Sequence, residues 1–132
     1  MLEATTITIA IDRNWRELYE AFWRPEAFPC WASGLSDASL KQVGGEWTAV
    51  GPGGTVSIVF TQHNPYGVMD HCVVVGAGAP IYVPLRIVEN GEGAQVALTL
   101  FRQPGMSDAA FAEDADAVRR DLARLKTLTE SG

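Results

Sequence analysis

The C-terminal segment constrains the fold most, because it carries one long amphipathic pattern. Its apolar positions recur at alternating spacings of four and three residues: Phe111, Ala115, Val118, Leu122 and Leu125. This spacing predicts a helix with one apolar face, capped by Ser107 or Asp108 and ending near Leu128. With a rise of about 1.5 Å per residue, the helix would be roughly 30 Å long and would cross an entire sheet.

The preceding segment, residues 40–103, has the pattern of strands separated by turns. Residues 64–67 (Asn-Pro-Tyr-Gly) suit a type I turn, and Asn90–Gly91 between two apolar runs is typical of a hairpin. We therefore expect an antiparallel meander of about five strands. A Gly-flanked strand with Trp47 comes first, followed by residues 55–63, 68–75, 80–88 and 94–102.

The chain opens with a strand and two short helices. Residues 5–11 alternate Ile with Thr or Ala, which is the period of a half-buried strand. Asp12 or Asn14 then caps a helix, and Pro25 ends it or starts a second short helix through residues 27–32. The apolar positions of the first helix are Trp15, Leu18, Tyr19 and Phe22.

Composition limits the classes of function. A length of 132 residues suits one domain, 1–132. The net charge of -6 argues against nucleic acid or an anionic membrane as the main partner, since both attract clustered cations. No basic and then apolar signal segment opens the chain, and its longest apolar run, residues 72–83, is too short to span a bilayer. We therefore expect a cytoplasmic protein without a membrane span.

The order of the elements predicts an α+β protein. A single antiparallel sheet must bury one apolar face, and only the C-terminal helix is long enough to cover it. A strongly twisted sheet that curls around one helix leaves a cavity between the two. We expect a curved antiparallel sheet wrapped around the long C-terminal helix, with the two short helices after the first strand.

Six segments, taken in order, resemble a known superfamily. They are ITIAIDRNWRELYEAF, PEAFPCWASG, GGEWTAVGPGG, HNPYGVMDHCVVV, VPLRIVENGEGAQVALTLFRQ and FAEDADAVRRDLARLKTLTE. Over essentially its whole length, the chain resembles the SRPBCC superfamily. This is the helix-grip fold of START lipid-transfer domains, birch-pollen allergens, polyketide cyclases and heat-shock ATPase activators. It is similar to bacterial members grouped as polyketide cyclase/dehydrase-like and lipid-transport-like. The resemblance implies a hydrophobic ligand in the cavity and carries no catalytic motif that transfers residue by residue.

The two histidines, His63 and His71, lie on either side of the 64–67 turn. A two-residue loop would place Phe60 opposite His71 and the two histidines on opposite faces. A bulge at Gly67 would place His71 opposite Thr61, on the same side as His63 but one pair further from the turn. Neither register makes a close pair, so we expect no metal site and no cofactor.

Face assignment decides the remaining polar candidates. Asp70 and His71 are strand neighbours and point to opposite faces, so Asp70 cannot orient His71, whose own face stays open. Tyr82, Pro84 and Arg86 share one face of their strand. If it lines the cavity, Arg86 and Tyr82 would hold a carboxylate or phenolate. If it faces solvent, which is slightly favoured, Arg86 is a surface charge and Pro84 marks an edge or bulged strand.

Aromatic and apolar residues complete the set of candidates. Trp31 and Trp47 resemble positions at the cavity mouth, although core packing is the more common fate of a Trp. Phe111 and Val118 come from the apolar face of the C-terminal helix. The candidate cavity-lining residues are therefore Trp31, Trp47, His71, Tyr82, Arg86, Phe111 and Val118.

The cysteines and a glycine-rich run predict no chemistry. Cys30 and Cys72 form no CxxC motif, and we expect both to be free and buried. Cys72 cannot use His71 as its base, because neighbours in a strand diverge. Residues 51–54 lack the Lys and Ser/Thr of a phosphate loop and are interpreted as a turn.

Three functions follow. The first is binding of a small hydrophobic molecule, a lipid or a polyketide-like or aromatic compound. The second is a cyclase or dehydratase acting on such a compound, with His71, Tyr82 or Arg86 as polar groups. The third is a protein-interaction domain similar to the heat-shock ATPase activators, using the outer sheet face. A homodimer is left open.

Overall fold

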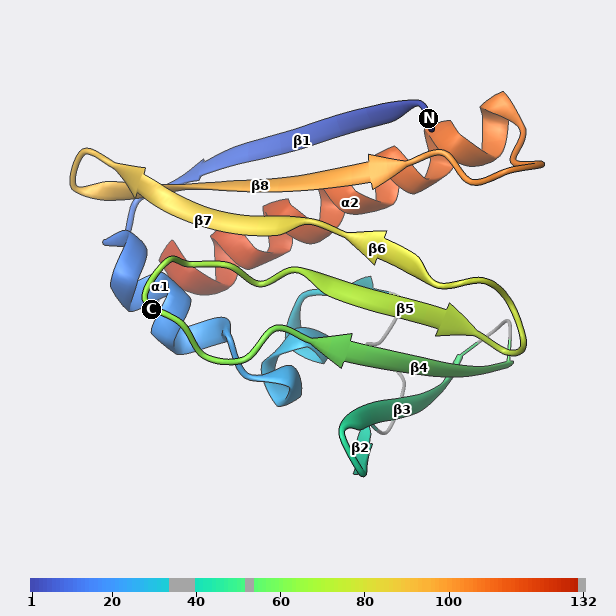
Figure 1. The fold of residues 1–132 in the computed structure, drawn as a ribbon. Helices are drawn as coiled ribbons and strands as arrows, with labels where there is room; N and C mark the ends of the chain where they lie inside the picture. Colours follow the sequence, from blue (N-terminus) through green and yellow to red (C-terminus); the bar gives the residue numbers. More distant parts are fainter. Residues whose placement is uncertain (34–39, 52–53, 131–132) are drawn as a thin grey trace.

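The computed structural model describes residues 1–33, 40–51 and 54–130. The expected turn at residues 51–54 lies partly outside this range. In chain order (Figure 1) the elements are β1 (Ala4–Ile11), α1 (Trp15–Phe22), the 3-10 helix η1 (Pro25–Cys30), β2 (Lys41–Val43), β3 (Glu46–Gly51), β4 (Gly54–Phe60), β5 (His71–Val75), β6 (Ile81–Val83), β7 (Leu85–Asn90), β8 (Gly93–Phe101) and α2 (Asp108–Glu130). The predicted α+β architecture, with two short helices after the first strand and one long C-terminal helix, is confirmed.

The strands form two antiparallel sheets rather than one continuous sheet. Their orders are β1-β8-β7 and β2-β3-β4-β5-β6. The predicted strand over 80–88 is divided at Pro84, which lacks the N–H that a ladder needs. The Pro84 carbonyl accepts from the Thr99 amide at 3.0 Å, so the residue between β6 and β7 stays hydrogen-bonded to β8. Figure 1 shows the two sheets diverging from this point.

The segment before β5 joins the two sheets. The predicted strand over 68–75 begins only at His71, because the residues before it pair with β7 instead. The Met69 amide donates to the Leu85 carbonyl at 2.8 Å, and the Ile87 amide donates to the Gly67 carbonyl at 2.9 Å. The curve of the sheet therefore depends on this crossing segment.

The turn at residues 64–67 is built by an asparagine and a glycine. The Asn64 side-chain oxygen accepts from the amides of Tyr66 at 3.0 Å and Val68 at 3.1 Å. Gly67 has a φ of 71°, and a Cβ there would lie 2.2 Å from the Ile87 carbonyl oxygen. Beyond the turn, Phe60 pairs with His71, as in the two-residue-loop alternative, although β4 ends at Phe60.

Side-chain caps and prolines set the helix boundaries. The Asn14 side-chain oxygen accepts from the Arg16 and Glu17 amides at 2.9 and 3.2 Å, so α1 begins at Trp15. Ser107 caps α2, since its hydroxyl oxygen accepts from the Ala110 amide at 3.1 Å. The other predicted caps, Asp12 and Asp108, do not fill this role: the Asp108 carboxylate is 2.6 Å from Arg102.

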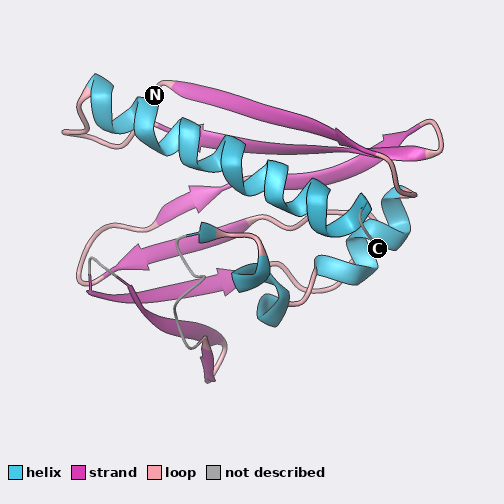
Figure 2. Ribbon diagram, turned by 180° about the vertical axis from the view of Figure 1, so that it is seen from behind, coloured by secondary structure: helices cyan, strands magenta, loops and turns pink. Residues whose placement is uncertain are grey.

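The core lies where α2 crosses the three-stranded sheet. Figure 2 shows α2 running along that sheet, with the five-stranded sheet curling away beneath it. The buried residues of this region include Ile7, Ile11, Leu18, Tyr19, Leu85, Ile87, Val96, Leu98, Ala115, Leu122 and Leu125. Each fully buried Leu or Ile contributes about 1.5–3 kcal/mol. In the described part of the chain, no helix is long and apolar enough to cross a membrane.

Candidate functional site: a pocket between the sheet and the long helix

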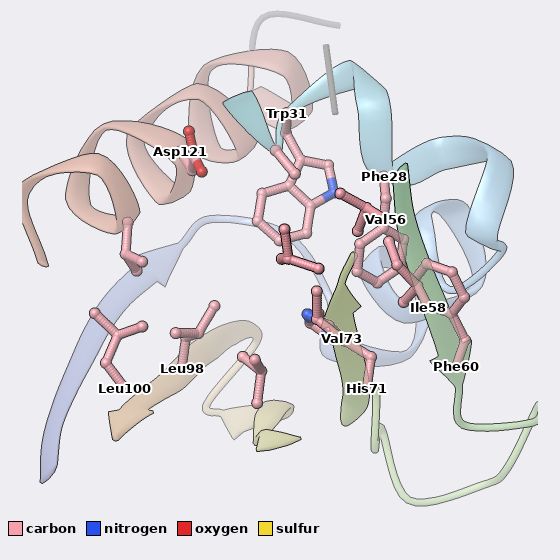
Figure 3. A pocket seen from close by; sticks show the side chains of 14 residues that line it. Phe28, Trp31, Val56, Ile58, Phe60, His71, Val73, Leu98, Leu100 and Asp121 are labelled. Carbon is pink, nitrogen blue, oxygen red and sulfur yellow. The ribbon is translucent and has the colours of Figure 1, made fainter. Parts of the chain in front are cut away.

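A pocket of about 330 Å³ lies between η1, α2 and the concave side of the strands. Figure 3 shows the side chains that line it: Phe28, Trp31, Ala32, Val56, Ile58, Phe60, His71, Val73, Val75, Val83, Leu98, Leu100, Val118 and Asp121. Of these lining residues, only Trp31, His71 and Asp121 carry nitrogen or oxygen in their side chains. An apolar hollow of this size with a few polar groups is typical of a small-molecule site.

Strand pairing explains why one face of β4 and β5 lines the pocket. Val56 lies opposite Val75, Ile58 opposite Val73, and Phe60 opposite His71. Residues that face each other in an antiparallel pair point to the same side of the sheet, and so do alternate residues along a strand. The register therefore sends His71 into the pocket and Asp70 to the other side.

His71 is held between two aromatic rings and one carbonyl. Its ring centroid lies 5.5 Å from Phe28 and 5.8 Å from Phe60. Its Nδ1 lies 3.2 Å from the Met69 carbonyl oxygen. A carbonyl only accepts, so Nδ1 carries the proton.

The same surroundings keep the His71 ring neutral. Burial lowers the pKa of His71, and this outweighs the Met69 carbonyl and the negative charge of Asp70, which both raise it. With the single proton on Nδ1, the lone pair of Nε2 is the free acceptor of the ring. Among the described residues, Nε2 has no hydrogen-bond partner.

Trp31 lines the same pocket, but its indole nitrogen is covered by protein atoms. It is 2% exposed and packs against Phe28, with ring centroids 5.5 Å apart. Its indole Nε1–H has no hydrogen-bond partner within the described part of the chain. Leaving such a buried donor unpaired costs about 1–3 kcal/mol.

Asp121 joins the helix to the segment that carries Trp31. One of its carboxylate oxygens accepts from the Ser33 amide at 3.1 Å. The bond links α2 to the chain just beyond η1, so Trp31 and Val118 are positioned by elements that are tied together.

Tyr82 and Arg86 lie outside the pocket and bind Asp70. The Asp70 side chain is 5% exposed. It accepts from Arg86 Nη2 at 2.9 Å, from Arg86 Nε at 3.3 Å, from the Leu85 amide at 2.9 Å and from the Tyr82 hydroxyl. Burial raises the pKa of the Asp70 carboxyl, but these hydrogen bonds together lower it by more. The net pKa therefore lies below the usual value. The three side chains hold the start of β5 against β6 and β7.

The other candidates from the sequence also lie away from the pocket. Trp47 on β3 and Phe111 in the first turn of α2 are partly buried, but neither lines it. Both cysteines are free, but Cys30 is exposed and Cys72 is only partly buried, so the expectation that both are buried is wrong. Cys30 ends the short surface helix η1, where little chain covers it.

A second hollow, near His63, is separate from the first. His63 Nε2 is 2.6 Å from a Glu20 carboxylate oxygen, and its ring stacks on Tyr19 at 5.6 Å. Both side chains of the His63–Glu20 pair are about half exposed. In residues 1–33, 40–51 and 54–130, no three His, Cys, Asp or Glu side chains are grouped to hold a metal ion.

Sequence reasoning missed much of the pocket wall. Phe28, Phe60 and Asp121 were not among the candidates. Alternation in residues 55–63 was visible, but which of its two faces points inward depends on how the sheet curls. Asp121 sits beside Leu122 on α2 and had no signal in the helical pattern.

No family model matches the sequence, and no curated protein matches it. Solved structures do match. DynU16, from the dynemicin biosynthetic locus, aligns with a TM-score of 0.73 at 16% identity, over 98% of this chain and 48% of DynU16, so this chain spans about half of that protein. Ara h 8.0201 aligns with a TM-score of 0.69 at 13% identity over 100% of both chains. The Aha1 dimer from Colwellia psychrerythraea aligns with a TM-score of 0.73 at 14% identity, over 96% of this chain and 95% of the other. These likenesses, with the curved antiparallel strands and the long α2, show that the chain has the helix-grip fold.

Proposed function

We propose that this protein binds a small, largely apolar molecule in the pocket between the strands and α2. One observation carries the proposal: a hollow of about 330 Å³ whose wall is apolar except for three side chains. The hollow is partly open to solvent, so its apolar wall is left uncovered, and uncovered apolar surface in a concave site usually marks a binding site. A pocket kept open at this size is therefore better explained by a ligand than by imperfect packing.

The pocket sets the size and class of this molecule. Its volume of about 330 Å³ lies at the small end of the range of about 300–1,000 Å³ that is usual for small-molecule sites. Phe28, Phe60 and Trp31 offer ring contacts, which favour an aromatic or polyketide-like compound. A section of a lipid chain is the other ligand of matching polarity.

A pocket-filling substitution tests the proposal. Val73 lines the pocket from β5, whereas Val59 on the neighbouring strand is 48% exposed on the outer face. Val73→Phe fills part of the hollow, so it should weaken binding of 2-methylnaphthalene at least tenfold in calorimetry, and Val59→Phe should leave it unchanged. Native mass spectrometry of gently purified protein, with organic extraction, should also detect a bound hydrophobic compound. Failure of 2-methylnaphthalene and of a lipid panel to bind, with nothing extracted, would contradict the proposal.

A second candidate function is an enzyme of the cyclase or dehydratase type. It is favoured by the neutral His71, whose bare Nε2 at an apolar wall is suited to accept a proton from a bound substrate. In this case His71→Phe should abolish turnover while the fold and ligand binding persist. Binding remains the primary proposal, because the described pocket brings no second acid–base residue into hydrogen-bond contact with His71.

The setting of the protein is part of the same proposal. A cytoplasmic location fits the sequence, and sedimentation would test for a homodimer, which the solved dimer of Aha1 makes worth measuring. A protein-interaction role on the outer sheet face would instead appear as a stable partner in a pull-down.

A further inference from the structure

We propose that the pocket selects an apolar ligand that carries one amine, whose ammonium group pairs with the Asp121 carboxylate. This inference rests on the proposed function and names the polar group of its ligand. It depends on one feature of the site: an otherwise apolar wall includes a carboxylate that has no cationic partner among the described residues.

One oxygen of the Asp121 carboxylate is in use and the other is free. Oδ1 accepts from the Ser33 amide at 3.1 Å, which holds the carboxylate against the segment beyond η1. Among the described residues, Oδ2 accepts no hydrogen bond, and no Arg, Lys or His forms an ion pair with Asp121. Figure 3 shows this side chain on α2, among those that line the pocket.

The free oxygen of Asp121 is accessible. Asp121 is half-buried, and its Oδ2 is not covered by protein atoms, in contrast to the indole nitrogen of Trp31. A carboxylate in an apolar wall has lost part of its hydration, and charges removed from water are usually paired. Because the described chain supplies no counter-charge, we expect the ligand to supply it.

The charge of the wall favours a cation over an anion. None of the lining residues is Lys or Arg, and His71 is the only one besides Asp121 that can ionise in the physiological pH range. Burial lowers the pKa of His71, so this ring adds no positive charge at neutral pH. The net charge of -6 on the whole chain has the same sign as Asp121. A ligand carboxylate, such as that of a fatty acid, is therefore repelled.

An ammonium group meets the need of Asp121 most directly. It brings a positive charge and N–H donors without an acceptor, whereas a hydroxyl donates one hydrogen bond without charge. A ketone or an ether would leave Oδ2 unpaired. A guanidinium binds best to both oxygens of a carboxylate, and Oδ1 is already bound by the Ser33 amide.

Three naphthalene derivatives of nearly equal size separate charge from shape. 2-Naphthylmethylamine is protonated at neutral pH, 2-naphthylmethanol is its uncharged counterpart, and 2-naphthoate is an anion. A partly exposed ion pair contributes up to about fivefold in affinity, so calorimetry should show the amine binding about fivefold more tightly than the alcohol. 2-Naphthoate should bind weakest.

One substitution removes the charge and keeps the shape. Asp121→Asn retains a side-chain oxygen that can accept from the Ser33 amide. It should lower the affinity for 2-naphthylmethylamine about fivefold, change that for 2-naphthylmethanol by less than about twofold, and raise that for 2-naphthoate. Asp116→Asn is the matched control, because it removes the same charge from α2 at a residue that does not line the pocket. The control should leave all three affinities unchanged.

Two measurements on the unsubstituted protein cover a variant that fails to fold. Added NaCl should weaken binding of 2-naphthylmethylamine and should not weaken binding of 2-methylnaphthalene, because salt screens only the charged pair. In a nitrogen–proton spectrum, the Ser33 amide signal should shift further with the amine than with the alcohol, since the amide donates to the same carboxylate.

The outcomes separate this inference from the proposed function. Equal affinity for the amine and the alcohol, or equal loss of amine affinity in Asp121→Asn and Asp116→Asn, would overturn the pairing with Asp121. So would an amine affinity that salt does not change. In each of these cases, binding of 2-methylnaphthalene leaves the proposed function standing. Absence of binding by 2-methylnaphthalene and by all three derivatives would overturn both.

Discussion

Replacing Asp70 by Ala should destabilise the protein by about 1–4 kcal/mol. The carboxylate is the acceptor for the Leu85 amide at 2.9 Å, and Leu85 is 1% exposed. An Ala leaves this buried N–H unpaired, which costs about 1–3 kcal/mol. The ion pair with Arg86 adds at most about 1 kcal/mol, because the Arg86 side chain is 55% exposed and screened by solvent.

Urea unfolding at neutral pH measures this loss directly. For a domain of this length, each kcal/mol corresponds to roughly 3–5 °C in Tm, so Asp70→Ala should melt about 10 °C below the unsubstituted protein. Asp116 is the control, since it also binds an arginine, Arg119, at 2.9 Å, but with both side chains exposed. Asp116→Ala should cost less than about 0.5 kcal/mol.

The acid limb of the stability curve provides an independent check on Asp70. Its folded pKa lies below the unfolded value of 3.8, so the unfolded state binds more protons as the pH falls. The stabilisation by Asp70 is complete above pH 3.8 and is lost as the pH drops toward the folded pKa. Asp70→Asn should therefore reduce the slope of stability against pH in this range. If Asp70→Ala and Asp116→Ala lower the urea midpoint equally, the account of Asp70 as a buried clamp is wrong.

Two further predictions concern His71 and Gly67. The folded pKa of His71 lies below 6.5, so its contribution to stability is complete above pH 6.5 and is lost as the pH falls toward the folded pKa. His71→Phe should flatten this slope when urea midpoints are measured at about pH 7.5 and pH 5.5. Methionine or asparagine substitutions elsewhere in the pocket should keep the slope. If His71→Phe also keeps the slope, the assignment of the slope to His71 is wrong. Gly67→Ala should cost at least about 3 kcal/mol in the same assay, because its Cβ would meet the Ile87 carbonyl, whereas Gly91→Ala, at a φ of 58° in open space, should cost about 1–2 kcal/mol. Equal losses at the two glycines would refute the steric argument.

Local patterns predicted the elements because each depends on residues near in sequence. The apolar stripe predicted α2, and the Ser107 cap at its start needs only the residues that follow it. The division of the sheets at Pro84 was harder, since it depends on Thr99 and on the segment before β5, which are distant along the chain. A proline in a strand signalled an edge or bulge, but not which strand would pair with the residues on either side.

The site was less predictable than the fold for a related reason. Trp31, His71 and Val118 were candidates and lie in the pocket, whereas Tyr82 and Arg86 were candidates and lie outside it. A strand pattern separates two faces without saying which is concave. That choice is made by the curl of the sheet, and therefore by contacts between distant elements.

Asp70 and His71 show how closely fold and site are coupled in this chain. Because neighbours in an extended strand point apart, Asp70 binds Arg86 on the outer side while His71 enters the pocket. The Met69 carbonyl that orients His71 belongs to the segment that joins the two sheets, and the Met69 amide is bound to the Leu85 carbonyl. The hydrogen bonds that hold the sheets together thus also set the direction of Nε2. Substitutions at Asp70 should accordingly disturb the pocket as well as lower stability, whereas substitutions at His71 should change the pocket without weakening the hydrogen bonds that join the sheets.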